Sequence, residues 1–177
     1  MIADNRECFP DQTEQLTIGP MERGDIDRVV EIERQSFPTC WRPDAYAREL
    51  ANPSARYLVA KLGGEVVGYA GMWAILDEAH ITTLAIAPER RGRGIGERLL
   101  VALLEAAECA GVKVATLEVR ESNAIARRLY NKYGFEPVAY MPGYYSDTGE
   151  DAVVMWLKPL RLLVPPAANG EPGEGAG

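Results

Sequence analysis

Cysteine and histidine are scarce in this chain of 177 residues. The three cysteines, Cys8, Cys40 and Cys109, are scattered, so they form neither a disulfide framework nor a cluster with metal-ligand spacing. His80 is the single histidine, which disfavours a Cys/His catalytic pair. The sequence therefore predicts no disulfides and no bound metal.

Long apolar runs and excess basic charge are also missing. Hydrophobic residues make up 47% of the chain, but no run approaches the length of a membrane span. The N-terminus lacks a signal-peptide pattern, so we expect a cytoplasmic protein. Nineteen Lys and Arg against 26 Asp and Glu give a net charge of −7, which argues against direct nucleic-acid binding. That charge is compatible with a basic peptide substrate.

Length and composition predict one domain with low-complexity ends. A chain of 177 residues is long enough to bury a substantial core, and no internal repeat is visible. Residues 1–14 lack periodicity and are interpreted as a flexible N-terminal extension. Residues 159–177 are rich in proline and glycine, which is typical of a disordered tail. The folded domain is predicted to span residues 15–158.

Strand and helix patterns alternate along that domain. Strands are predicted at 16–18, 57–61, 65–73, 80–86, 114–119, 138–140 and 152–157. Helices are predicted at 25–35, at 43–50, at 97–110, and from an N-cap at Asn123 to residue 133. The predicted loop at 142–150 joins the last two strands. A parallel crossover in the middle and hairpins at both ends predict an α/β fold with a mixed sheet.

The segment Arg91-Gly92-Arg93-Gly94-Ile95-Gly96 stands between a β-rich run and a helix pattern. The free N–H groups of a helix's first turn, together with the helix dipole, favour a bound anion. Glycine allows a positive φ and a close approach of backbone to ligand. The segment therefore predicts a phosphate-binding loop.

Further segments follow in a characteristic order: Leu117-Glu118-Val119-Arg120, then Ser122-Asn123, then Leu129-Tyr130 before Gly134-Phe135. With the glycine loop, this order resembles the GNAT family of acetyl-CoA-dependent N-acetyltransferases. The resemblance implies a mixed central sheet of six or seven strands, splayed between the fourth and fifth and flanked by about four helices. It also implies an acetyl-CoA site made by Leu84, Ala85, Ile86, Arg91, Gly92, Arg93, Gly94, Ile95, Gly96 and Asn123.

A closer resemblance covers about residues 15–158. The pattern Leu-Glu-Val-Arg-x-Ser-Asn, with a tyrosine twelve residues after the glutamate, is similar to bacterial ribosomal-protein-alanine N-acetyltransferases of the RimI type. The segments 32–41 and 144–155 support this. The resemblance implies that Glu118 is the general base, that Tyr130 is the acid, and that Tyr144 and Tyr145 line a peptide groove. The implied acceptor is the N-terminal alanine of small-subunit ribosomal protein eighteen.

The residues alone leave other interpretations open. Glu118 is also explained as an edge position paired with an arginine, Tyr130 as core, and Asn123 as a helix cap only. His80 is interpreted as a strand residue without catalytic duty. For the whole chain, one alternative is a GNAT enzyme that acetylates a small-molecule amine or a lysine side chain. The other is a module that binds CoA without catalysis.

Overall fold

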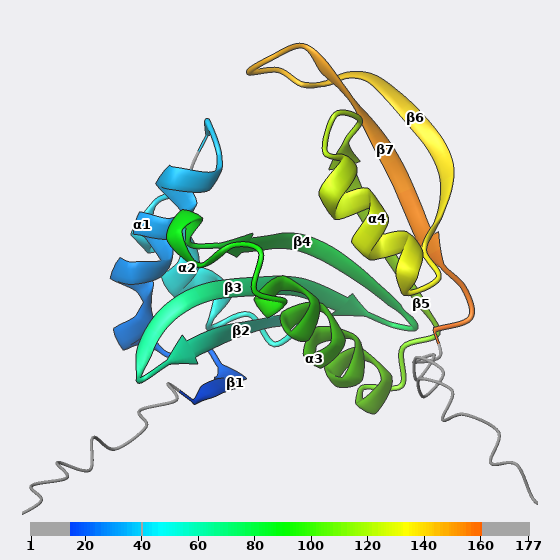
Figure 1. The fold of residues 1–177 in the computed structure, drawn as a ribbon. Coiled ribbons are helices and arrows are strands. Elements are labelled where there is room, and N and C mark those ends of the chain that lie inside the picture. The colour runs from blue at the N-terminus through cyan, green and yellow to red at the C-terminus, as the bar shows by residue number, and fades with distance from the viewer. Residues whose placement is uncertain (1–14, 40, 161–177) are drawn as a thin grey trace, which may run out of the picture.

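The computed structural model describes residues 15–39 and 41–160 (Figure 1). The predicted extension, Cys40 and residues 161–177 of the predicted tail lie outside the described residues. Pro159 and Leu160 belong to the predicted tail but are described. Leu160 is buried, and its backbone N–H donates to the carbonyl of Lys113 at 2.7 Å.

The described residues form one seven-stranded mixed sheet with the strand order β1-β2-β3-β4-β5-β7-β6. The strands are β1 (Leu16–Pro20), β2 (Ala55–Leu62), β3 (Glu65–Ile75), β4 (Glu78–Ile86), β5 (Val114–Arg120), β6 (Glu136–Tyr145) and β7 (Glu150–Leu157). The α-helices are α1 (Ile26–Ser36), α2 (Pro43–Glu49), α3 (Ile95–Cys109) and α4 (Ala124–Lys132). The α/β fold with a mixed sheet is confirmed.

The parallel pairing between β4 and β5 is short. Residues 78–81 of β4 lie beside residues 114–117 of β5, and the pairing ends at Ile81 and Leu117. Beyond that point β4 stays paired with β3, whereas β5 stays paired with β7. Because each strand follows a different partner, the two diverge, and β5–β7 rise away from β1–β4 (Figure 1). The predicted splay is confirmed.

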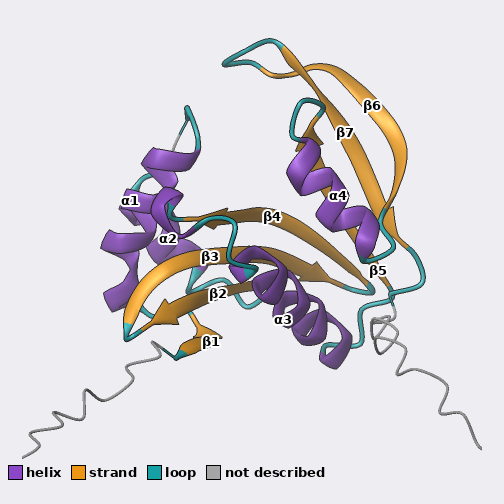
Figure 2. Ribbon diagram, in the orientation of Figure 1, coloured by secondary structure: helices purple, strands orange, loops and turns teal. Residues whose placement is uncertain are grey.

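Helices cover the two faces of the sheet unequally (Figure 2). The core under α3 and α4 includes Leu117 and Val119, while α1 and α2 pack on a second core on the opposite face, over β2–β4. Side chains alternate along a strand, so Glu118 and Arg120 point away from α3 and α4. The functional carboxylate expected at Glu118 therefore lies on the face that α1 and α2 share.

The region predicted as a loop at 142–150 is mostly strand. β6 continues to Tyr145, β7 begins at Glu150, and only residues 146–149 form the turn. The strand pairing shifts register between Met141 and Tyr145, where Gly143 adopts φ 62°. Such a bulge lets pairing continue past two extra residues of β6 and re-aims the neighbouring side chains. The glycine and proline that suggested a loop mark this bulge instead.

Candidate active site

Glu118 lies directly after the last β5 residue that pairs with β4. Its side chain is 21% exposed, and its Oε2 lies 3.2 Å from Nε2 of His80 on β4. The diverging strands thus bring a carboxylate and an imidazole together on one face. Sequence reasoning missed this contact. Only the parallel register, which pairs His80 with Thr116, brings His80 close to Glu118 two residues further along β5.

His80 is one member of a longer polar chain. Its Nδ1 lies 3.0 Å from the hydroxyl of Thr116, and that hydroxyl donates to Glu78 at 3.2 Å. While the Thr116 proton points at Glu78, the hydroxyl oxygen must accept from His80 Nδ1–H. Glu118 also needs a donor at Nε2, so this arrangement requires imidazolium. Loss of a proton from His80 would free the Thr116 hydroxyl to donate to Nδ1.

The electrostatics agree with that proton count. The hydrogen bond to Glu118 raises the pKa of His80 above its usual 6.5, although burial acts in the opposite direction. The charges of Glu118 and Glu78 add to the increase. His80 therefore holds its proton to a higher pH than a free histidine does.

Tyr130 comes from the other face of the sheet. It lies in α4, is 8% exposed, and packs in the core with its ring centroid 5.7 Å from that of Phe135. Burial, with a smaller contribution from Tyr145, raises the pKa of Tyr130 to about 12. The phenol is therefore protonated across the neutral range and is able to donate a proton.

The start of α4 agrees with the predicted cap. The Asn123 side-chain oxygen accepts from the backbone N–H of Ala126 at 3.1 Å. Capping of this kind satisfies one of the donors that a helix leaves unpaired at its N-terminus. The helix-cap role of Asn123 is confirmed.

The glycine loop leads into α3 as the sequence predicted. Gly92 and Gly94 both have φ 74°, and a Cβ added to either would meet nothing within 4 Å. Gly94 is the N-cap, and no side chain caps the first turn of α3. The unpaired N–H groups of that turn therefore suit an anion that approaches from this open space.

The two loop arginines differ in their surroundings. Arg91 donates through Nε to the carbonyl of Ile86 at 3.0 Å and through Nη2 to the Ser36 hydroxyl at 3.0 Å. It thereby ties the loop to β4 and to the end of α1. Arg93 is exposed and lies next to Gly94 along a surface hollow beside α3.

The three predicted thioester-binding residues lie beyond the parallel pairing. Leu84, Ala85 and Ile86 pair with β3 on one side, and β5 does not reach them on the other. One edge of this part of β4 therefore presents backbone groups without a strand partner. Such an edge is suited to hydrogen bonds with an extended amide-containing ligand, which is the chemistry of pantetheine.

Tyr144 and Tyr145 end β6 next to the turn. Their rings meet edge to face with centroids 5.1 Å apart, and Tyr144 is 47% exposed. Burial and then the charge of Glu118 raise the pKa of Tyr144. Burial raises the pKa of Tyr145 to about 12, and Glu118 again adds to the increase. The two phenols thus share the electrostatic surroundings of Glu118.

The sequence matches a known family over this whole arrangement. The model of the family described as "Acetyltransferase (GNAT) family" matches residues 26–135, which span β2–β5 and all four α-helices. This chain belongs to the GNAT acetyltransferase family.

Several relatives with names share a third or more of their aligned residues with this chain. A relative from Bacillus subtilis is 44% identical over 138 residues, which cover 77% of this chain and 91% of that protein. The N-alpha-acetyltransferase RimI of Mycobacterium tuberculosis is 41% identical, with coverage of 81% and 92%. The ribosomal protein bS18-alanine N-acetyltransferase of Escherichia coli K12 is 34% identical, with coverage of 80% and 96%. The predicted resemblance to the RimI type is confirmed.

Solved structures agree with this assignment. The crystal structure of the ribosomal-protein-S18-alanine N-acetyltransferase from Escherichia coli superposes with a TM-score of 0.76 at 29% identity, covering 88% of this chain and 100% of that one. An acetyltransferase from Salmonella typhimurium, solved with its cofactor acetyl-CoA, gives a TM-score of 0.70 at 25% identity, with coverage of 87% and 99%.

No α-helix within 15–39 and 41–160 is both long and apolar enough to cross a bilayer.

The His80–Glu118 contact makes a prediction for NMR. His80 is the single histidine, so its ring resonances need no assignment. We expect a pKa above 6.5 in the wild type and a lower pKa in Glu118→Gln, because the substitution removes the largest cause of the increase. The pair stabilises the fold fully below pH 6.5, and this stabilisation is lost as the pH rises through the raised pKa. Identical titration curves in the two proteins would contradict the contact.

Proposed function

We propose that this chain transfers the acetyl group of acetyl-CoA to the α-amine of a protein N-terminus, and that the N-terminal alanine of ribosomal protein bS18 is its substrate. The observation that carries the proposal is the placement of Glu118 at the splay, facing His80 and sharing its surroundings with Tyr144 and Tyr145. The Escherichia coli relative, named for the alanine of ribosomal protein bS18, supports the choice of acceptor, and the N-alpha-acetyltransferase of Mycobacterium tuberculosis supports acetylation of an α-amine.

The glycine loop and the free edge of β4 are proposed to hold acetyl-CoA. The N–H groups at the start of α3 suit the pyrophosphate, and the backbone of residues 84–86 suits the pantetheine arm. Arg93 is exposed and available to a phosphate. Arg91 instead holds the loop through its hydrogen bonds to the Ile86 carbonyl and the Ser36 hydroxyl. Asn123 is proposed to contact the ligand while it caps α4.

Glu118 and Tyr130 are proposed as the proton-transfer pair. Bound acetyl-CoA supplies an electrophilic thioester carbonyl. Glu118 accepts a proton from the substrate ammonium, directly or through water, which frees the nitrogen lone pair for attack. Tyr130 donates its phenolic proton to the departing thiolate, the nitrogen that has gained the acetyl group returns a proton to the Tyr130 oxygen, and Glu118 releases its own proton to water. The hydrogen bond from His80 orients the Glu118 carboxylate.

A terminal amine suits a site with a single base. An α-amine has a pKa of about 7.7–8.0, so roughly a tenth of it is neutral at pH 7, whereas lysine near 10.4 is below about a thousandth. We expect a peptide that begins Ala-Arg to be acetylated on its α-amine. Mass spectrometry of the products compares this peptide with peptides that begin Ser, Thr or Met. Acetyl groups found mainly on lysine, or faster reaction of small free amines, would point to the alternative acceptors. No turnover despite bound CoA would point to a binding module.

Substitution of the base tests the mechanism. We expect Glu118→Gln to lower kcat roughly 10²–10⁴-fold at pH 7, the usual range for one acid–base group, with acetyl-CoA affinity unchanged. The loss should be smaller at pH 9, where most of the α-amine is already neutral. Glu121→Gln, an exposed carboxylate next to the strand end, is the matched control. Wild-type turnover by Glu118→Gln at pH 7 would refute the role of Glu118.

Two glycines at opposite ends of α3 test the cofactor site. Gly94 and Gly111 have φ of 74° and 82° and open space at Cβ, so Gly94→Ala and Gly111→Ala carry a similar backbone cost of about 1–2 kcal/mol. Only at Gly94 would the methyl group stand where the phosphates bind. We expect calorimetry to show acetyl-CoA affinity at least tenfold weaker in Gly94→Ala and unchanged in Gly111→Ala. Equal affinities would overturn the assignment of this loop.

A further inference from the structure

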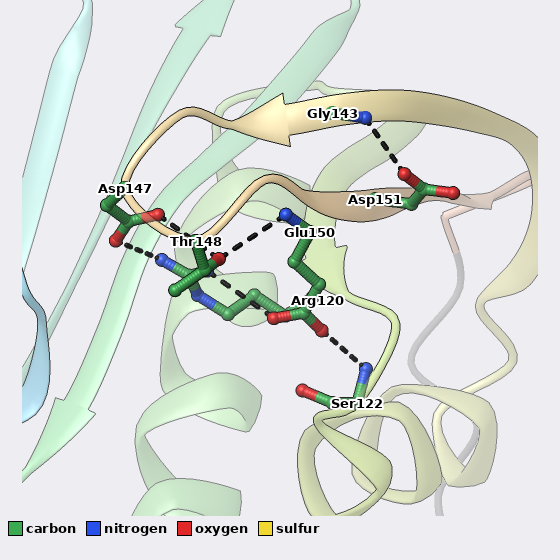
Figure 3. A network of polar contacts seen from close by, with 7 residues as sticks. All are labelled: Arg120, Ser122, Gly143, Asp147, Thr148, Glu150 and Asp151. Atoms are coloured by element: carbon green, nitrogen blue, oxygen red, sulfur yellow. Dashed lines mark hydrogen bonds and ion pairs between the residues drawn. The ribbon is translucent and has the colours of Figure 1, made fainter.

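Arg120 connects the strand that carries Glu118 with the turn between β6 and β7 (Figure 3). Its Nη2 lies 2.6 Å from Oδ2 of Asp147, and its Nη1 lies 2.7 Å from the Thr148 hydroxyl and 3.4 Å from Oε2 of Glu150. Arg120 stands two residues after Glu118, so both side chains lie on the same face of β5. One guanidinium thus contacts two turn residues and the first residue of β7, beside the proposed base.

The same guanidinium also holds an aromatic ring. Its central carbon lies 4.0 Å from the centroid of the Tyr145 ring, and Tyr145 in turn packs edge to face against Tyr144. Glu118 contributes to the raised pKa of both tyrosines. The position of the two phenols relative to Glu118 therefore depends on Arg120.

Other bonds close the turn upon itself and fix its shape. The N–H groups of Thr148 and Gly149 donate to the carbonyl of Tyr145 at 3.1 and 2.7 Å, and Gly143 N–H donates to Asp151 Oδ1 at 2.8 Å. A second tie to the body runs from the Ser122 N–H to Oε1 of Glu150 at 2.7 Å. The turn is thus a preformed unit that Arg120 and Ser122 attach beside the active face.

The chemistry of this attachment favours a fixed geometry. The Arg120, Asp147 and Glu150 side chains are only 22%, 17% and 23% exposed, so solvent screens them less than a surface pair. The hydrogen bond from Arg120 holds the pKa of Asp147 below its usual range. The planar guanidinium matches several acceptors at once, which a lysine ammonium does not. Without Arg120, the carboxylates of Asp147 and Glu150 would lose the cation that both contact.

We propose that Arg120 is a positioning residue that fixes the β6–β7 turn, with Tyr144 and Tyr145, on the face of β5 that carries Glu118 and so sets the size of the first peptide residue that the site accepts. This inference rests on the proposed acetylation of peptide N-termini. Arg120 touches neither reacting group. It acts through the tyrosine pair, which shares the electrostatic surroundings of Glu118.

The test compares Arg120→Lys and Arg120→Ala with the wild type on peptides that differ in their first residue, Ala or Met. We expect the peptide KM to rise roughly tenfold in Arg120→Ala while the KM for acetyl-CoA stays unchanged. The preference for Ala over Met should fall by about tenfold, the order that one side-chain contact supports. Arg120→Lys keeps one charge contact, so it should restore stability but not the full preference.

Arg28 on α1 provides the matched control. It pairs with three carboxylates, those of Glu31, Glu65 and Glu89, where Arg120 pairs with two, and its side chain is 25% exposed. It lies on α1 and bonds to the carbonyl of Val66 on β3, not to the β6–β7 turn. We expect Arg28→Ala to lose comparable stability and to leave the peptide KM and the Ala-to-Met preference unchanged.

Hydrogen exchange separates this proposal from the proposed function. We expect the amides of residues 143–149 to exchange faster in Arg120→Ala than in the wild type, whatever the acceptor is. Faster exchange with an unchanged Ala-to-Met preference would overturn the positioning role, and so would unchanged exchange. Wild-type acetylation of lysines only would refute the proposed function, and with it the role of Arg120 in selecting the first residue.

Discussion

The early end of the pairing between β4 and β5 is the constraint on which the site depends. After Ile81 and Leu117 each strand remains with its outer partner, so no backbone ladder closes the space between them. Backbone groups without partners are costly when they are buried, and a ligand that bonds to them relieves that cost. The same divergence leaves Glu118 within reach of His80, at a position where β5 no longer pairs with β4. The proposed cofactor edge and the proposed base thus depend on the same feature of the sheet.

The hydrogen bonds around Glu118 depend on how protons are shared among four neighbouring polar side chains. Glu78, Thr116, His80 and Glu118 form one chain in which the Thr116 hydroxyl can donate in only one direction at a time. Protonated His80 is bonded at both ring nitrogens, and loss of its proton requires the hydroxyl to turn toward it. The charge of His80, beside the proposed base Glu118, is therefore coupled to the orientation of the Thr116 hydroxyl, two positions earlier on β5. The environment of Glu118 changes with pH even though no other histidine lies in the chain.

Features carried by neighbouring residues were predictable from the sequence. The glycine loop, the Asn123 cap and the strand before α3 lie within short windows, where periodicity and φ preferences act locally. Contacts between distant segments were not. Arg91 reaches Ser36 across 55 residues, Arg120 reaches Asp147 across 27, and His80 meets Thr116 across 36. The length of β6 was also missed, because Pro142 and Gly143 suggest a loop when the paired strand that accommodates a bulge is unknown.

This contrast divides the active site into two parts of different origin. The proposed acetyl-CoA side is built mainly from residues 84–96, a single strand–loop–helix passage, with Asn123 and the tie from Arg91 to Ser36 added from elsewhere in the chain. The proposed peptide side draws on β4, β5 and the β6–β7 turn, held together by His80 and Arg120. A substitution in the turn can therefore alter the acceptor side while the thioester remains bound in the same way. Because function depends on the site and not on the fold, the proposed selection of the first peptide residue is assigned to the side-chain contacts of the turn.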